Sequence, residues 1–490
     1  MKNVIITIFL MLVILATCAR GAELPVPGEF PTIQSAINAA VNGDTVIVAP
    51  GTYTGDGNRD IDFLGKAITV RSIKPDDPNI VAATIIDCNG TESDPHRGFY
   101  FHSGEDANSI VDGFTITNGY APYGGGIGAA TPSRHPPRPT INNCIISGNS
   151  ADSFGGGIYG CNGPITNCTI TGNVALHCSE GGGVASCRGP ITNCTITDNS
   201  AYMGGGVASC QGPITNCTIT GNSAYYDGGG LYRCVGPITN CIISNNDARI
   251  FGGGLASCSN VTNCTIIGNI AELNEDFDHD SYGGGISEGR KATNCIIRDN
   301  WPDQVHNSTV TYSNVQDGWP GEGNIDTDPC FVQPGYWDSN GTPADSNDDF
   351  WVDGDYHLKS EGWRWDSVRG RWDYDDVTSR CIDAGNPGSP LGDELLSVPD
   401  DPNNEWGQNL RIDMGAFGGT AEASIPPYDW ALLADLTNDG LVDLADFAYQ
   451  AADWLNSTDQ QPGDLNRDSL IDTDDLALLV ENWLGQTTWH

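Results

Sequence analysis

The middle of the chain repeats a short alternation of polar and apolar residues. The unit Asn-Cys-Thr-Ile-Thr-Gly-Asn recurs with small changes, at intervals of 23 to 31 residues. Within Cys168-Thr169-Ile170-Thr171, the cysteine and the isoleucine share one face of an extended strand and the two threonines share the other. We therefore predict an interior column of Cys and Ile and an exterior column of Thr or Ser. The Asn-Cys pairs begin at Asn143, Asn167, Asn193, Asn216, Asn240, Asn263 and Asn294.

Three consecutive glycines separate successive units, and each triplet leads into an aliphatic residue such as Ile158 or Val184. Helical repeats have no place for three glycines in a row, and the regular leucines of leucine-rich repeats are absent. We predict that each period is one coil of three short strands in a solenoid, with the triplet at a corner. The triplets begin at Gly124, Gly155, Gly181, Gly204, Gly228, Gly252 and Gly283.

Two further columns have a predicted structural role. An asparagine lies five residues after the cysteine of each unit, as at Asn173 and Asn222. Stacked about 4.8 Å apart, such amides can hydrogen-bond along the stack. The stacked cysteines have parallel Cβ vectors, which suit a disulfide poorly, so we expect buried, reduced thiols. Cys330 and Cys381 lie outside the columns and are the better candidates for a disulfide.

The repeat resembles the right-handed parallel β-helix proteins of the pectin-lyase-like class, over roughly residues 30–420. It is also similar to the Gly-Gly and Asn-rich repeats of chlamydial polymorphic outer-membrane proteins, without the Phe-x-x-Asn half of that signature. Residues 31–40 read as an amphipathic helix opening on Thr32, and residues 43–53 read as strand, like the cap of the first coil in this class. The predicted fold class is all-β: a right-handed parallel β-helix solenoid with an N-terminal helical cap, plus a small C-terminal α-helical calcium-loop domain.

The charge balance narrows the choice of partners. The chain holds 63 Asp and Glu against 22 Lys and Arg, a formal charge of -41, which excludes nucleic acid and anionic membranes as good partners and suits cations. Residues 1–21 read as a signal peptide, and no later apolar run reaches the ~20 residues of a membrane span. We expect a secreted, extracellular or cell-envelope protein without a transmembrane segment in the mature chain. A retained anchor, or lipidation at Cys18, is the alternative.

The sharpest motif is a pair of twelve-residue segments, 435–446 and 464–475, which begin 29 residues apart. Each places oxygen-bearing side chains at positions 1, 3, 5, 9 and 12 and a backbone carbonyl at position 7, as a calcium-binding EF-type loop does. The alternative is an acidic helix pair that binds no calcium. The predicted ligands are Asp435, Thr437, Asp439, Leu441, Asp443 and Asp446 in the first loop, and Asp464, Asn466, Asp468, Leu470, Asp472 and Asp475 in the second.

Each loop leads into a predicted helix that ends in Trp-Leu, and the pair resembles a type I dockerin. That resemblance implies a cohesin-like receptor protein as a partner. Thr437 replaces the usual Asn at position 3, and Ser469 replaces the glycine at position 6, at some conformational cost. Positions 10 and 11 lack the Ser/Thr pairs of cellulosomal dockerins, which leaves another envelope protein or this same chain as the alternative partner.

Candidate catalytic residues come from the column just before the glycine triplets. Glu180 and Asp227 are two rungs apart, or roughly 9.5 Å, which fits the ~6.5–9.5 Å between the carboxylates of an inverting glycosidase. Surface carboxylates are common in so acidic a chain, and this is the alternative reading. The whole column reads Tyr123, Phe154, Glu180, Met203, Asp227, Phe251 and Tyr282.

Three functions follow from these features. The first is an exported β-helix protein that binds extracellular or cell-surface polysaccharide and carries a calcium-dependent, dockerin-like attachment module. The second is a polysaccharide-degrading enzyme, either an O-glycosyl hydrolase or a polysaccharide lyase. The third is an ice-binding or purely structural surface protein, because Thr-x-Thr pairs recur in three units, at Thr169, Thr195 and Thr218.

The predicted boundaries follow the changes in composition. Residues 301–420 hold eight of the twelve tryptophans, and we expect a capping subdomain with its own small core, with sugar stacking as the alternative. The predicted segments are 1–21, signal peptide; 22–118, cap and first coils; 119–300, regular repeats; 301–420, irregular final coils; 421–430, linker; and 431–490, dockerin-like domain.

Overall fold

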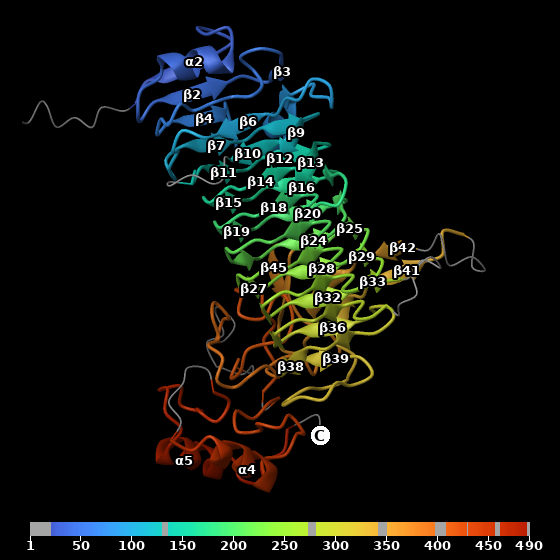
Figure 1. Cartoon of the computed structure of the whole chain (residues 1–490). Helices are drawn as coiled ribbons and strands as arrows, with labels where there is room; N and C mark the ends of the chain where they lie inside the picture. Colours follow the sequence, from blue (N-terminus) through green and yellow to red (C-terminus); the bar gives the residue numbers. More distant parts are fainter. Residues whose placement is uncertain are drawn as a thin grey trace, which may run out of the picture.

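The computed structural model describes residues 21–129, 136–272, 281–341, 350–396, 408–428, 430–455 and 461–487. Cys18 lies outside these ranges, and so does the predicted signal peptide except for residue 21. The described chain winds into an all-β parallel solenoid with the N-terminal cap at one end and the helices α4 (Leu444–Ala452) and α5 (Thr473–Glu481) at the other (Figure 1). No described helix is long and apolar enough to cross a membrane.

Four parallel sheets run along the solenoid, so a coil has four short strands where the sequence predicted three. The extra strand precedes the glycine triplet, where the alternation is too short to be recognised from the sequence.

The twelve-stranded sheet contains β1 (Glu23–Val26), β2 (Thr45–Val48), β4 (Thr69–Ser72), β7 (Ile110–Asp112), β11 (Thr140–Asn142), β15 (Ile165–Thr166), β19 (Ile191–Thr192), β23 (Ile214–Thr215), β27 (Ile238–Thr239), β31 (Asn260–Thr262), β35 (Lys291–Thr293) and β38 (Thr309–Thr311). The eleven-stranded sheet contains β3 (Gly51–Thr54), β5 (Thr84–Asp87), β8 (Thr115–Thr117), β12 (Ile145–Ser147), β16 (Thr169–Thr171), β20 (Thr195–Thr197), β24 (Thr218–Thr220), β28 (Ile242–Ser244), β32 (Thr265–Ile267), β36 (Ile296–Arg298) and β39 (Asn314–Val315).

The seven-stranded sheet contains β9 (Tyr120–Tyr123), β13 (Ser150–Phe154), β17 (Val174–Ala175), β21 (Ser200–Ala201), β25 (Ser223–Ala224), β29 (Asp247–Ala248) and β33 (Ile270–Ala271). The nine-stranded sheet contains β6 (Phe99–Phe101), β10 (Ile127–Ala129), β14 (Ile158–Tyr159), β18 (Val184–Ala185), β22 (Val207–Ala208), β26 (Leu231–Tyr232), β30 (Leu255–Ala256), β34 (Ile286–Ser287) and β37 (Val305–His306).

The N-terminal end is closed as the sequence predicted. The helix α2 (Ile33–Ala39) begins after Thr32, whose side chain accepts a hydrogen bond from the Ser35 amide, while the Ser35 hydroxyl reaches back to the amide of Thr32. Ile33 and Ile37 are fully buried against the first coils, so the helix covers apolar surface that a solenoid end would expose. A second short helix, α3 (Pro78–Ala83), lies beside β5 and β8.

The interior of the solenoid is one continuous hydrophobic core, and the cysteine columns lie in it. Cys168, Cys194 and Cys217 are at most 2% exposed, and the strands that flank them pair in register from coil to coil. Each of the described cysteines is a free thiol, including Cys330 and Cys381, so the candidate disulfide is not formed. Cys381 is buried beside Asn314, whose amide donates to its sulfur at 3.0 Å.

The asparagine ladder is formed as predicted. Asn222 donates through Nδ2 to Oδ1 of Asn246 at 2.9 Å, and its own Oδ1 accepts from Nδ2 of Asn199 at 2.9 Å. The same bonds continue along the stack, and the ladder is buried. Its members are Asn149, Asn173, Asn199, Asn222, Asn246, Asn269 and Asn300, with Gln304 at the end.

The glycine triplets form the tightest corner. The first glycine of each has a positive φ, 65° at Gly155 for example, which L-residues rarely adopt. A Cβ on the second, Gly156, would lie 2.5 Å from the carbonyl oxygen of Val174 in the next coil. Glycine is therefore required both for the turn and for the close approach of neighbouring coils.

The region after β39 builds a second core that packs against the solenoid. This core holds Phe331, Trp351 and Tyr356 and packs against Ile267 and Ile296 of the β-helix. Its antiparallel hairpins pair β40 (Phe331–Gln333) with β43 (Asp355–Leu358), β41 (Tyr336–Asp338) with β42 (Phe350–Val352), and β44 (Arg364–Asp366) with β45 (Arg371–Asp373).

The segment 421–430 was predicted as a linker, but several of its described residues, 421–428 and 430, are buried. Ile425 is 0% exposed and forms an antiparallel bridge with Trp363, and Trp430 joins the second core. Prolines 426 and 427 gave the segment its linker-like composition, but composition does not show which long-range contacts a segment makes.

Candidate functional site

A row of surface side chains runs along the solenoid where the chain enters the glycine triplets. Glu180 pairs with Met203, and Asp227 pairs with Phe251, through parallel bridges between coils. The residues predicted as catalytic therefore do lie in one file, two coils apart, between the seven-stranded and the nine-stranded sheets. We call this file the acidic–aromatic row; its members are Tyr123, Phe154, Glu180, Met203, Asp227, Phe251 and Tyr282.

The two carboxylates of the row have different surroundings. Glu180 accepts a hydrogen bond from the Ser209 hydroxyl at 2.6 Å. Asp227 is half-buried, and its Oδ1 is a buried atom with no hydrogen-bond partner in the described chain. Burial, followed by the negative charge of Glu288, raises the pKa of Asp227 to about 6. Asp227 can therefore hold a proton in mildly acidic solution while an ordinary carboxyl cannot.

The structure adds residues to the site that the sequence analysis missed. Glu288 lies near Asp227 and accepts from the Ser257 hydroxyl at 3.2 Å. Tyr232 is only 3% exposed, and the Arg233 guanidinium lies 4.8 Å from the centre of its ring. Ser209, Arg233, Ser257 and Glu288 occupy one column, two residues after the aliphatic residue that follows each triplet. That register was readable from the repeat.

Aromatic rings flank the carboxylates at both ends of the row. Tyr123 and Phe154 stack with ring centroids 6.1 Å apart. Beyond Asp227, Phe251 and Tyr282 stack at 6.3 Å, and Tyr282 lies 4.4 Å from the ring of His306. Rings beside polar groups are how proteins hold sugars, because the apolar face of a sugar packs on the ring while its hydroxyls bond to carboxylates.

The predicted calcium loops have the same internal geometry twice. Asp435 accepts from the amides of Asp439 and Gly440, and Asp464 accepts from the amides of Asp468 and Ser469 at 3.0 and 2.8 Å. At position 12 of each loop, Asp446 and Asp475 are fully buried and complete capping boxes with the helix N-caps Asp443 and Asp472. The predicted helices are α4 and α5.

Each loop offers oxygen atoms, the ligand type that a divalent cation such as calcium prefers. Burial raises the pKa of Asp435 to about 6. The charge of Arg411 and the hydrogen bond from the Gly440 amide oppose this shift, and the smaller effects of the Asp446 and Asp439 charges add to it. Bringing these carboxylates together is costly unless a cation neutralises them. Within the described residues, no three His, Cys, Asp or Glu side chains converge as a metal cluster on their own. The carboxylates bond to loop amides, so calcium binding stays a prediction.

Ser469 bears out the expected strain at position 6. Its φ is 75°, in the left-handed region, where the equivalent Gly440 has a φ of 91°. A residue with a side chain is disfavoured there by about 1–2 kcal/mol.

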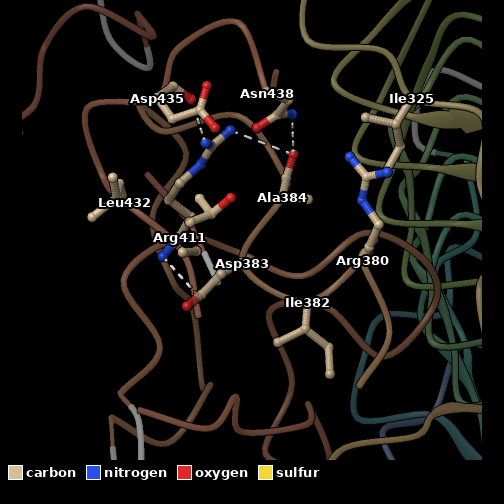
Figure 2. Close-up of a pocket in the computed structure, with 11 residues that line it drawn as sticks. Ile325, Arg380, Ile382, Asp383, Ala384, Arg411, Leu432, Asp435 and Asn438 are labelled. Carbon is tan, nitrogen blue, oxygen red and sulfur yellow. Dashed lines mark hydrogen bonds between the residues drawn. The ribbon is translucent and has the colours of Figure 1, made fainter. Parts of the chain in front are cut away.

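The first loop packs against the segments that follow the last coil of the β-helix (Figure 2). The buried Arg411 guanidinium donates to the carbonyl oxygen of Asp435 at 2.7 Å and to that of Gly385 at 2.6 Å. Asn438 donates to the carbonyl oxygens of Ala384 and Gly323 at 2.8 and 2.9 Å.

Further bonds attach the module to the solenoid. The Tyr312 hydroxyl donates to the carbonyl of Leu436 at 3.1 Å, and Arg467 of the second loop donates to the carbonyl of Leu410 at 2.7 Å. Asn438 and Arg467 occupy the same position in the two loops, so both loops contact the same body. The sequence analysis had left pairing within the same chain open, and the structure shows this contact.

The threonine array extends over three neighbouring strands. Thr169, Thr195 and Thr218 are paired in register on β16, β20 and β24. The array ends at Ile242, which packs against the second core, and Thr220 bonds to Asp353 at 3.0 Å.

Two of the comparisons with known proteins found a match. Residues 143–161 match the model of the Chlamydia polymorphic membrane protein repeat. Among solved structures, the chain is similar to one described as the crystal structure of pectate lyase Pel9A, with 14% identity and a TM-score of 0.42, over 81% of this chain and 95% of that chain. No curated protein sequence matches. The parallel β-helix assignment itself rests on the strand registers given above.

Proposed function

We propose that this protein is an exported β-helix that binds a linear extracellular or cell-surface polysaccharide along the acidic–aromatic row. The observation that carries the proposal is the order of side chains in that row: stacked rings, then carboxylates, then stacked rings. The row spans seven coils at about 4.8 Å per coil, which gives roughly 29 Å. A sugar chain lying parallel to the solenoid axis could contact both aromatic groups and the acids between them.

The row can be tested by removing its rings. Phe154→Ala and Tyr282→Ala each remove one stacking surface at opposite ends, and each should weaken polysaccharide binding about tenfold, as loss of an aromatic anchor does. Thr195→Ala, on the exposed face of β20, is the matched control and should bind as the unaltered protein does. Binding unchanged by both ring variants on a polysaccharide panel would refute the proposal.

A second candidate function is polysaccharide cleavage, by hydrolysis or by elimination. It is favoured by Asp227, whose raised pKa suits a general acid, with Glu288 nearby and Glu180 two coils away in the same row. Release of reducing ends or of unsaturated uronides should then fall at least about a hundredfold in Asp227→Asn. If the unaltered protein shows no turnover on the panel, the binding function stands without catalysis.

We also propose that the two loops bind calcium and that the module attaches the protein to a cohesin-like receptor. Its helices leave a group of large apolar side chains exposed, which a partner protein could cover. These are Leu444, Phe447, Trp454, Leu455, Val480, Trp483 and Leu484.

Calorimetric titration of the chelated full-length protein with calcium tests the first part of that proposal. Two binding events are expected, and Asp446→Asn and Asp475→Asn should each remove one of them, because each takes away the position-12 carboxylate of one loop. A flat titration of the unaltered protein would refute calcium binding.

A further inference from the structure

A cleft separate from the acidic–aromatic row lies between the β-helix and its C-terminal region. It has a volume of about 540 Å³, within the range of small-ligand sites. One wall comes from the corner and strands around Asn216 and Thr218, and the other from residues 416–422 together with Asp393. Two segments that are about 200 positions apart in the sequence therefore form one concave surface.

The second wall is held rigidly against the β-helix. Asn240 donates through Nδ2 to the carbonyl oxygen of Ala416 at 3.1 Å and also to that of Gly418. The Asn263 amide donates to the same Gly418 oxygen at 2.7 Å. The corner asparagines of two coils thus fix the segment that carries the cleft's side chains, and the cleft is formed before any ligand binds.

A buried histidine positions two of the lining side chains. His357 is 4% exposed, and its ring stacks on Phe417 with centroids 3.6 Å apart. Its Nε2 lies 3.2 Å from Glu422 Oε2, and its Nδ1 lies 2.6 Å from Asp355 Oδ1. His357 therefore holds the Phe417 ring and the Glu422 carboxylate, which both line the cleft, in a fixed relation.

The chemistry of the lining selects the class of ligand. It offers the Phe417 ring, the carboxylates of Asp393 and Glu422, and the hydroxyls of Thr218 and Thr420, and none of the described lining residues is Lys or Arg. The two carboxylates accept hydrogen bonds from hydroxyl or amino groups, and a lining without Lys or Arg does not attract anions.

We propose that this cleft is a second binding site, for a sugar chain without acid groups, built of hexose or hexosamine units. The ring face of one sugar packs on Phe417, and its hydroxyl or amino groups donate to Asp393 and Glu422. The site is independent of the acidic–aromatic row, because it lies at the corner between the twelve- and eleven-stranded sheets.

The test is calorimetric titration of the full-length protein with three hexasaccharides, of glucose, glucosamine and galacturonic acid. We expect binding of the glucose or the glucosamine chain, the stronger of the two identifying the class, and none of the galacturonic acid chain. Phe417→Ala and Glu422→Gln should each weaken that binding about tenfold. Asp393→Asn removes an exposed carboxylate, is not expected to alter the fold, and should weaken binding several-fold.

The row variants separate this inference from the proposed function. Phe154→Ala and Tyr282→Ala should leave hexasaccharide binding at the cleft unchanged. Binding of the galacturonic acid chain equal to that of the other two would overturn the inference. The inference would also be overturned if none of the three probes bound. It would be overturned as well if binding were lost in the row variants and kept in all three cleft variants, and this result would leave the proposed function standing.

Discussion

The asparagine ladder makes a quantitative prediction about stability. In Asn222→Ala, the side chain loses the two Nδ2 hydrogens that are shared among three acceptors, the carbonyl oxygens of Ile196 and Thr220 and Oδ1 of Asn246, at 2.9, 3.1 and 2.9 Å. It also loses two accepted bonds, from the backbone amide and Nδ2 of Asn199, at 3.1 and 2.9 Å. The partners on both neighbouring coils, Asn199 and Asn246, are each 1% exposed and so lose these bonds away from bulk water.

The cost follows from the groups left without partners. The Asn199 amide and one of its Nδ2 hydrogens lose their acceptor, and Oδ1 of Asn246 loses a donor. Each unsatisfied buried group costs about 1–3 kcal/mol, and partial relaxation of the coils offsets some of this. We therefore expect the free energy of unfolding to fall by about 3–6 kcal/mol. Asn222→Leu fills the volume without restoring a bond and should cost a similar amount.

Urea unfolding followed by far-ultraviolet circular dichroism measures this difference. The matched control is Asn193→Gly, which removes an exposed amide at a corner with a φ of 54°, a conformation that glycine adopts freely, and should change the free energy by less than about 0.5 kcal/mol. A cost for Asn222→Ala that equals the control would refute a stabilising role for the ladder. A large cost for Asn222→Ala that Asn222→Leu abolishes would assign the effect to packing instead of hydrogen bonding.

Three further predictions concern the C-terminal region and the thiols. Ser469→Gly should relieve the strained φ of 75°, stabilise the second loop by about 1 kcal/mol and tighten its calcium binding several-fold by calorimetry, whereas Ser469→Ala should not. Burial raises the pKa of Asp383 to about 7 and that of Glu394 to about 8, so the folded state binds protons that the unfolded chain releases above about pH 4. Melting temperature should therefore fall as pH rises from about 4 to about 8, and Glu394→Gln should flatten this dependence; a slope that the substitution leaves unchanged would contradict the assignment. A thiol reagent should label the exposed Cys178 in the native protein and buried Cys168 only after unfolding, and rapid labelling of Cys168 would place it outside the core.

The repeat made most of the β-helix predictable from the sequence. A period-two alternation that recurs at a nearly constant interval leaves few alternatives for which side chains face inward, and Cys168, Asn173 and the glycine triplets all lie where it predicts. The helix that begins after Thr32 was equally readable, since its capping signal is local. Such features depend on neighbours in the sequence or on the same position one period away.

The features that escaped prediction depend on contacts between distant segments. Asp227 and Glu288 belong to different coils and different columns; the repeat gives both columns, but the path of the chain decides how close the two charges lie. The packing of Asn438 against Gly323 joins residues 115 positions apart, and no local pattern encodes it. The fourth strand of each coil was missed for a different reason: two residues, as in β17 and β21, are too few to show an alternation.

The hydrogen bonds that join Arg411 to Asp435, Asn438 to Gly323 and Arg467 to Leu410 have a mechanical consequence, because they attach the two loops to the rest of the chain. A module joined by a flexible linker would let the β-helix take any orientation relative to the module. Here, tension applied at α4 and α5 passes through these hydrogen bonds, and through the bond from Tyr312 to Leu436, into the C-terminal region and the last coil. Whatever anchors those helices therefore also sets the direction in which the long axis points.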